Sequence, residues 1–221
     1  VDGPVLEAKH RSFVGMHPIP VVHGMTLGEL ARMIDGEGWL RDGLRCKLTV
    51  IPCRGYTHRS RYRLPTAPSP NLPNMRAVYL YPSLCFFEGT PVSLGRGTDF
   101  PFQAYGHPEL QGDFSFTPRS NAGAKNPPLK DKLCHGVDLR TSPSDERIWE
   151  REVDLGYVID CYRQLNLGEK FFTPMFDRLT GTDYVRQMIL QGAGADRIKA
   201  SWADDVERFK QTRKPYLLYE E

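Results

Sequence analysis

The chain has 221 residues, of which 40% are hydrophobic and 25% are charged. This balance is enough to bury the core of one large domain or two small ones, and it excludes a disordered protein. A formal net charge of +2 is too small to indicate a nucleic acid partner. No apolar run approaches the roughly 20 residues needed to cross a bilayer, so no membrane span is expected.

The first residues give no sign of a natural start. Residues 1–7 lack an initiator Met, a basic beginning and an apolar signal core. We therefore expect the chain to begin after processing or partway through a longer protein.

The first predicted helix begins at a capping box. Thr26 and Glu29 are three residues apart and precede an apolar run that starts at Leu30. In this motif the Thr side chain accepts from the backbone at the Glu, and the Glu side chain reaches back. The helix is expected to end near Gly36 or Gly38.

The next segments predict an α/β layer. Residues 44–53 alternate enough to predict a strand, and the proline-rich residues 54–76 predict a long surface loop. Residues 77–81 are a candidate short strand, and residues 83–87 a helical turn. In an α/β layer, the residues that bind ligands usually lie on loops at the ends of strands.

The cysteines do not indicate a metal or disulfide framework. The five cysteines are odd in number and show no C-x-x-C spacing. Cys46 and Cys53 would point to opposite faces of the predicted strand, so a disulfide bridge between them is not expected.

Residues 106–112 have the composition of a linker or a domain edge. We therefore divide the chain into residues 1–106 and residues 107–221. Strands are predicted at residues 113–117 and 134–139, with a polar loop between them.

The C-terminal region is predicted to be mainly helical. Apolar residues at helical spacing indicate helices over residues 153–165, stopped by Gly168, and over residues 182–192 and 198–209. Residues 216–219 predict a last strand. The apolar stripes are interpreted as core rather than as a cofactor site, because one such face holds a helix on its domain.

The candidate functional segment is the glycine-rich stretch over residues 86–102. It follows neither helical nor strand periodicity, so core packing alone does not explain it. A glycine-rich turn that carries charged groups is typical of a ligand cradle. Its polar residues are Glu88, Ser93, Arg96, Thr98 and Asp99, set among Gly89, Gly95 and Gly97.

The charge pattern before this segment favours an anionic ligand. No Asp or Glu occurs from Gly43 through Phe87, and Glu88 is the first acid after the run. A local positive field favours an anion and holds a nearby carboxylate ionised. A solvated loop is the alternative interpretation. The basic residues of the run are Arg45, Lys47, Arg54, Arg59, Arg61, Arg63 and Arg76.

Several motifs, in order along essentially the whole chain, resemble the NamZ-type (YbbC-like) exo-β-N-acetylmuramidases. The segments that carry the resemblance are Gly24-Met25-Thr26-Leu27-Gly28-Glu29-Leu30-Ala31, Ser69-Pro70-Asn71, Phe87-Glu88-Gly89-Thr90, Gly95-Arg96-Gly97-Thr98, Cys134-His135-Gly136-Val137 and Arg213-Lys214-Pro215-Tyr216-Leu217-Leu218-Tyr219.

The resemblance implies a peptidoglycan-processing glycosidase that releases N-acetylmuramic acid from the non-reducing ends of cell-wall fragments. The implied fold is a Rossmann-like domain followed by a smaller α/β C-terminal domain, with the active cleft between them. The implied partners are peptidoglycan-derived muramyl saccharides, the implied location is periplasmic or secreted, and no cofactor is expected.

One family motif is missing from the chain. The family's leading catalytic candidate is the glutamate of a Glu-His-Gly motif, and none of the six histidines here follows a Glu. We therefore expect this chain to be the C-terminal portion of a longer protein, with a separate N-terminal segment completing the Rossmann-like domain.

The residues still suggest roles in glycoside hydrolysis, which usually uses two carboxyl groups. Glu88 and Asp99 are the catalytic candidates, although Asp99 could instead orient a sugar hydroxyl or pair with Arg96. Arg96 is the first choice for the lactyl carboxylate of muramic acid, because a guanidinium binds such a group in a fork. The candidates for neutral substrate contacts are Asn71, Ser93 and Thr98.

Two other classes of function compete with the glycosidase. A peptidoglycan or sugar binding module without catalysis would explain the missing motif. A metal-dependent hydrolase would use His58, His107 or His135, but no H-x-x-x-H or H-E-x-x-H spacing supports it, so no metal site is predicted.

Overall fold

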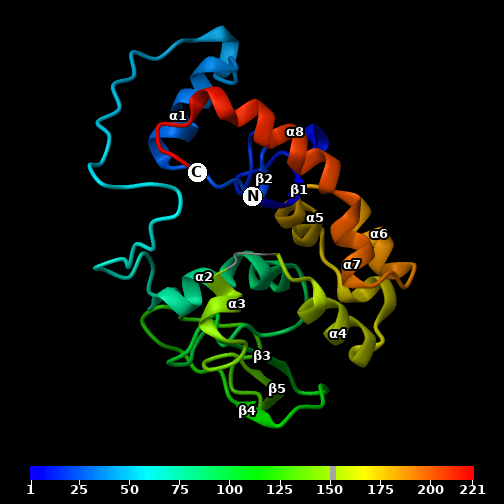
Figure 1. The fold of residues 1–221 in the computed structure, drawn as a ribbon. Helices are drawn as coiled ribbons and strands as arrows, with labels where there is room; N and C mark the ends of the chain where they lie inside the picture. The colour runs from blue at the N-terminus through cyan, green and yellow to red at the C-terminus, as the bar shows by residue number, and fades with distance from the viewer. Residues whose placement is uncertain (150–152) are drawn as a thin grey trace.

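The computed structural model describes residues 1–149 and 153–221. The chain combines helices with two small antiparallel sheets, one of which lies at the lower edge of the view in Figure 1, so the fold is α/β in the broad sense that the sequence predicts. The strands are β1 (Asp2–Val5), β2 (Pro20–Val22), β3 (Ala104–His107), β4 (Phe114–Phe116) and β5 (Cys134–Asp138). The α-helices are α1 (Leu27–Gly36), α2 (Met75–Leu84), α3 (Asp145–Trp149), α4 (Gly156–Leu165), α5 (Pro174–Thr180), α6 (Tyr184–Leu190), α7 (Ala195–Ser201) and α8 (Ala203–Arg213). The short 3-10 helices are η1 (Ala8–His10), η2 (Arg41–Gly43), η3 (Cys85–Gly89), η4 (Gly168–Phe171) and η5 (Lys214–Tyr216).

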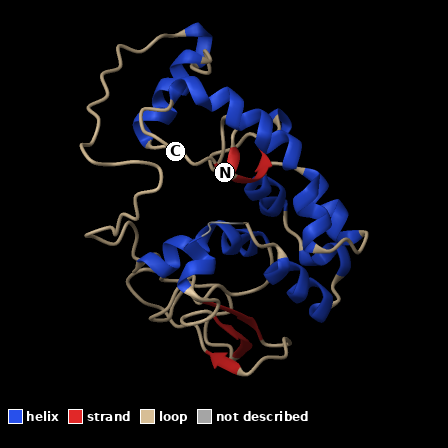
Figure 2. Cartoon of the chain, in the orientation of Figure 1, coloured by secondary structure: helices blue, strands red, loops and turns tan. Residues whose placement is uncertain are grey.

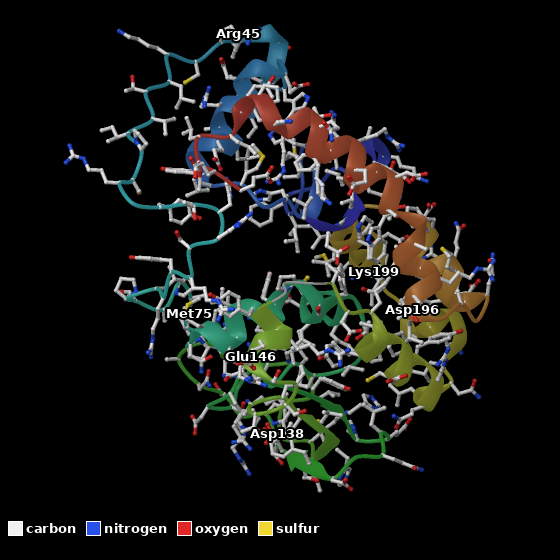
Figure 3. All side chains as sticks on the ribbon, in the orientation of Figure 1. Arg45, Met75, Asp138, Glu146, Asp196 and Lys199 are labelled. Atoms are coloured by element: carbon white, nitrogen blue, oxygen red, sulfur yellow. The ribbon has the colours of Figure 1, made fainter. Side chains whose placement is uncertain are left out.

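The first strand is anchored by a buried carboxylate. One oxygen of Asp2 accepts from Trp202 Nε1 at 2.9 Å, and the other accepts from the Val153 backbone at 2.8 Å. Lys199 of α7, which is labelled in Figure 3, also contributes, since its ammonium lies 3.4 Å from the same carboxylate. These contacts fix β1 and its antiparallel partner β2 against the end of the helical region.

The first helix matches its prediction. Thr26 Oγ1 accepts from the Glu29 backbone, and the Glu29 side chain accepts from the Thr26 backbone at 2.7 Å. The helix ends at Gly36, as expected. The capping box is therefore confirmed in both directions.

Two predicted strands in the first half are wrong. Residues 44–53 are mostly exposed and pair with no strand of the described chain, and Figure 2 draws them as part of a long loop. Residues 77–81 lie inside α2, because Asn74 caps that helix by accepting from the Ala77 backbone at 3.0 Å. The buried Ala77, Leu80 and Leu84 then follow helical spacing. The loop predicted between these segments is irregular up to Asn74.

The three-stranded sheet has the order β3-β5-β4, with antiparallel pairs throughout. The predictions for β4 and β5 are confirmed, while β3 was not expected. Gly136 faces Gly106 across the first pair, and a side chain at Gly136 would meet the Tyr105 carbonyl oxygen at 2.0 Å. The glycine of the Cys-His-Gly motif therefore allows two backbones to approach closely.

The C-terminal region is helical, as predicted, with three changes in detail. Asn166, in the left-handed conformation with φ of 46°, ends α4 ahead of Gly168. The stripe over residues 198–209 belongs to two helices, α7 and α8, which meet at the buried Trp202. Residues 216–219 form the end of η5 and an irregular tail instead of a strand.

One large hydrophobic core joins α2 and η3 to the helices from α4 to α8. The apolar stripes predicted as core do lie in it, with Val158, Ile198 and Trp202 almost fully buried. Within the described ranges, none of the helices combines the length and apolar character that a bilayer crossing requires.

Candidate functional site

Two adjoining cavities lie between β2 with its following loop and the α2–η3 region. Their volumes are about 410 and 360 Å³, and both are lined by Val21 and His23. We call the combined space the central groove. The arrangement brings together an imidazole, a carboxylate and guanidinium groups from segments far apart in the sequence.

His23 stands where the two cavities meet. Its Nδ1 accepts from the Met25 backbone at 3.2 Å, which places the proton of the neutral ring on Nε2. Burial, together with the charge of Arg213, lowers the pKa of His23. At neutral pH His23 is therefore an uncharged ring with a donor available to a ligand.

Glu88 lines one end of the central groove, on η3. Arg96 Nη2 donates to Glu88 Oε1, and the Arg96 guanidinium carbon lies 4.9 Å from the centre of the Phe102 ring. Both charged side chains are more than two-thirds buried. Arg96 therefore pairs with Glu88, whereas the sequence left open a pair with Asp99.

The other end of the central groove is built around Arg213 and His58. Arg213 is 5% exposed and its Nη1 donates to the Gly24 carbonyl at 2.6 Å. His58 Nε2 lies 3.0 Å from Oε1 of the buried Glu29. Sequence reasoning did not select Arg213 or His23. The signal for His23 was its position directly after a strand and before a helix cap, where loops often carry ligand groups.

The other predicted site residues are not gathered in this groove. Asp99 is exposed and, with Thr98, lines a separate cavity of about 520 Å³. Thr98 Oγ1 donates to the Gly95 carbonyl at 2.6 Å, and the fully buried Ser93 Oγ accepts from the Gly95 backbone at 3.3 Å. Asn71 Nδ2 donates to the Gly123 carbonyl at 2.9 Å. Their assignment as substrate contacts stays a prediction.

The glycines of the candidate segment have a packing role. A side chain at Gly89 would meet the Phe176 backbone at 2.5 Å, and one at Gly97 would meet the Arg119 carbonyl oxygen at 2.4 Å. Gly97 also has φ of +83°, which L side chains rarely adopt. The glycine pattern therefore reflects close packing of this loop on α5 and on the loop after β4.

Among the described residues, one group could hold a metal ion. It consists of Glu7, His10 and Asp183, whose potential ligand atoms lie within 4.8 Å of one another. The Lys9 ammonium already lies 3.0 Å from Asp183 and 3.2 Å from Glu7. His58, His107 and His135 do not belong to this group.

The fold and the groove define an α/β protein whose groove carries charged groups of both signs on a partly apolar lining. Residues 1–76 match the family model "Exo-beta-N-acetylmuramidase NamZ, N-terminal", and residues 79–219 match "Exo-beta-N-acetylmuramidase NamZ, C-terminal". The chain therefore belongs to the NamZ family, and the resemblance seen in its motifs is confirmed. The domain boundary at residue 106 stays a prediction.

One curated relative supports this assignment, and two solved structures share the fold. The chain is 32% identical to the peptidoglycan β-N-acetylmuramidase NamZ of Bacillus subtilis (strain 168), over 99% of this chain and 56% of that protein. It matches a crystal structure of a DUF1343 family protein from Bacteroides fragilis with a TM-score of 0.97 and 62% identity, over 100% of this chain and 63% of the other. A second Bacteroides fragilis DUF1343 protein shares the fold, with a TM-score of 0.78 and 21% identity, over 100% of this chain and 62% of the other. The chain thus spans less than two-thirds of the length of these relatives.

Proposed function

We propose that the chain is part of a peptidoglycan-processing glycosidase that releases N-acetylmuramic acid from non-reducing ends, as the name of its Bacillus relative suggests. The observation that carries this proposal is the central groove, which is lined by both Glu88 and His23, with Glu88 held by an ion pair to Arg96. Such a groove offers both charge and neutral hydrogen bonds to a sugar.

Glu88 is proposed as a carboxyl group at the scissile bond. Arg96 holds the Glu88 side chain in one orientation, and its sequence-based assignment to the lactyl carboxylate stays a prediction. His23 donates a hydrogen bond from Nε2 to a sugar oxygen. Asp99, which lines a different cavity, is proposed to orient a sugar hydroxyl only if substrate extends beyond the groove.

Glycoside hydrolysis needs a second carboxyl group within about 5 to 9.5 Å of the first. We propose that the glutamate of the family's Glu-His-Gly motif supplies it, from a Rossmann-like sheet to which this chain contributes. The proposed location is periplasmic or secreted, with a role in cell-wall recycling. These points rest on the family alone.

The test compares this chain with a longer form that includes the Glu-His-Gly motif. Both are incubated with a chromogenic N-acetylmuramide and with the matching N-acetylglucosaminide. Release from the muramide by the longer form supports the proposal, and Glu88→Gln in that form should lower kcat by about 10²- to 10⁴-fold. Saccharide binding with no turnover by the longer form would overturn it in favour of a binding module.

A further inference from the structure

The Arg213 end of the central groove contains a buried cation that is not fully bonded. Nη1 donates to the Gly24 carbonyl and Nη2 donates to the Glu221 carboxylate, but Nε is buried and has no hydrogen-bond partner. A buried donor without a partner is destabilising, because it has lost its hydrogen bond to water. Arg213 lines the cavity, so a ligand there can approach a guanidinium whose bonding capacity is incompletely used.

Two imidazoles line the same cavity. His58 is held by Glu29, a side chain with no exposed surface whose carboxylate also accepts from the backbones of Leu218 and Thr26 at 2.7 Å. His23 carries its proton on Nε2, as shown above. Side chains from three distant segments therefore line one space of about 410 Å³, and two of them, Arg213 and His23, carry donors for a ligand there.

The acidic residue among those that line this cavity is Glu221. Its carboxylate lies on Arg213, while its side chain is 57% exposed. The neighbouring tail is fixed more firmly, because the Glu220 carbonyl accepts from the His58 backbone at 2.8 Å. Glu221 therefore places a carboxylate on Arg213 from a largely solvent-exposed side chain, which an incoming carboxylate can replace.

We propose that the Arg213 end of the central groove is a carboxylate-binding subsite, which recognises the lactyl carboxylate of a muramyl sugar and is occupied by Glu221 in the absence of ligand. The identity of the sugar rests on the proposed function, whereas the carboxylate chemistry rests on the guanidinium of Arg213 and the Nε2 donor of His23. This assignment differs from the sequence-based choice of Arg96, whose guanidinium is already paired with Glu88. A guanidinium suits the role because it binds a carboxylate through two parallel N–H donors.

The experiment measures binding of N-acetylmuramic acid, N-acetylglucosamine and D-lactate to this chain by calorimetry. The parent should bind the muramic acid more tightly than the glucosamine, because only the former has the carboxylate. Glu221→Gln removes the competing carboxylate from an exposed position. It should tighten binding of N-acetylmuramic acid and D-lactate by about two- to fivefold, because the Glu221 side of the ion pair is exposed and screened by solvent, and leave N-acetylglucosamine unchanged.

Arg213→Lys should weaken binding of both carboxylates by roughly tenfold or more, because the fork is lost. Circular dichroism verifies that the variant is folded. The matched control is Arg208→Gln, which removes an exposed guanidinium on the same helix and should change no affinity.

Equal affinity of the parent for the two sugars would overturn the subsite, and so would a Glu221→Gln variant with unchanged carboxylate binding. Neither result depends on turnover, because the readout is binding. If carboxylate binding responds as expected but the longer form releases no muramic acid, the subsite is supported and the proposed function alone fails.

Discussion

Glu29 and His58 are joined by a contact of 3.0 Å between Glu29 Oε1 and His58 Nε2, although they are 29 residues apart. The same carboxylate accepts from the Thr26 backbone and from the Leu218 backbone, 189 residues away. One buried acid therefore connects the start of α1, the long irregular segment and the C-terminal tail. Two of the connected segments reach the central groove, the irregular segment through His58 and the tail through Glu221.

Glu29→Gln should lower the free energy of unfolding by about 2–3 kcal/mol, because charge-assisted hydrogen bonds become neutral and the amide nitrogen of Gln faces donors. Urea denaturation followed by circular dichroism measures the change. Glu109→Gln, at an exposed loop position, is the matched control and should stay within about 0.5 kcal/mol of the parent. Equal midpoints for the two variants would contradict the role given to Glu29.

The same carboxylate predicts a pH dependence. Burial alone would raise the pKa of Glu29, but hydrogen bonds from Leu218, Thr26 and His58 outweigh it and the pKa is lowered from its ordinary 4.5. A carboxyl with a lowered folded pKa stabilises fully above its unfolded pKa, and this contribution is lost as pH falls through the folded value. The gap in stability between the parent and Glu29→Gln should therefore be constant near neutral pH and shrink under acid conditions. A gap that is independent of pH would contradict the ionised state.

The capping box shows what local sequence can predict. Thr26 and Glu29 are neighbours on one helical turn, so their bonds to each other follow from spacing alone. The bonds from His58 and Leu218 depend on where the chain returns after an irregular segment and after the whole second half. Periodicity carries no information about such long-range contacts, which is why Glu29 was predicted only as a cap.

Gly89→Ala should destabilise the protein by about 1–3 kcal/mol, because an added Cβ would meet the Phe176 backbone at 2.5 Å. Thermal or urea denaturation provides the measurement. Gly194→Ala is the control, since a Cβ there has no neighbour within 4 Å. If Gly89→Ala and Gly194→Ala have the same stability, the close contact between η3 and α5 does not restrict the residue at position 89.

The glycine-rich segment was interpreted as a ligand cradle because its pattern matched no regular element. The structure places only Glu88 of its predicted residues at the central groove, while Gly89 and Gly97 allow backbone contacts. A sequence cannot distinguish these two uses of glycine, because both need the absence of a side chain. The predicted strand at residues 44–53 is wrong for a different reason. Alternation of apolar and polar residues indicates a half-buried strand only when a partner strand exists.

The five cysteines should react in two classes. Cys46 and Cys53 are exposed free thiols, while burial raises the pKa of Cys85 and Cys161 to about 12 and that of Cys134 to about 11. The thiolate is the reactive form, so buried neutral thiols are inert. A chromogenic disulfide reagent should therefore titrate two thiols rapidly in the native protein and all five in denaturant. Rapid reaction of a third thiol in native buffer would show that the core is more open than described.

Arg96→Ala should lower kcat/KM on a chromogenic muramide by about 10- to 100-fold in the form of the protein that turns it over. Arg96 orients Glu88 through their ion pair and packs over Phe102, so its loss frees a carboxylate that glycoside hydrolysis needs in one position. Arg119→Ala, which removes a guanidinium with a 75% exposed side chain, is the control and should keep parental kinetics.

The ratio of muramide to glucosaminide activity separates two roles for Arg96. If Arg96 only positions Glu88, both activities fall together and the ratio stays constant, whereas a direct contact with the lactyl carboxylate would lower the muramide activity alone. Unchanged kcat/KM in a folded Arg96→Ala variant would remove Arg96 from the site.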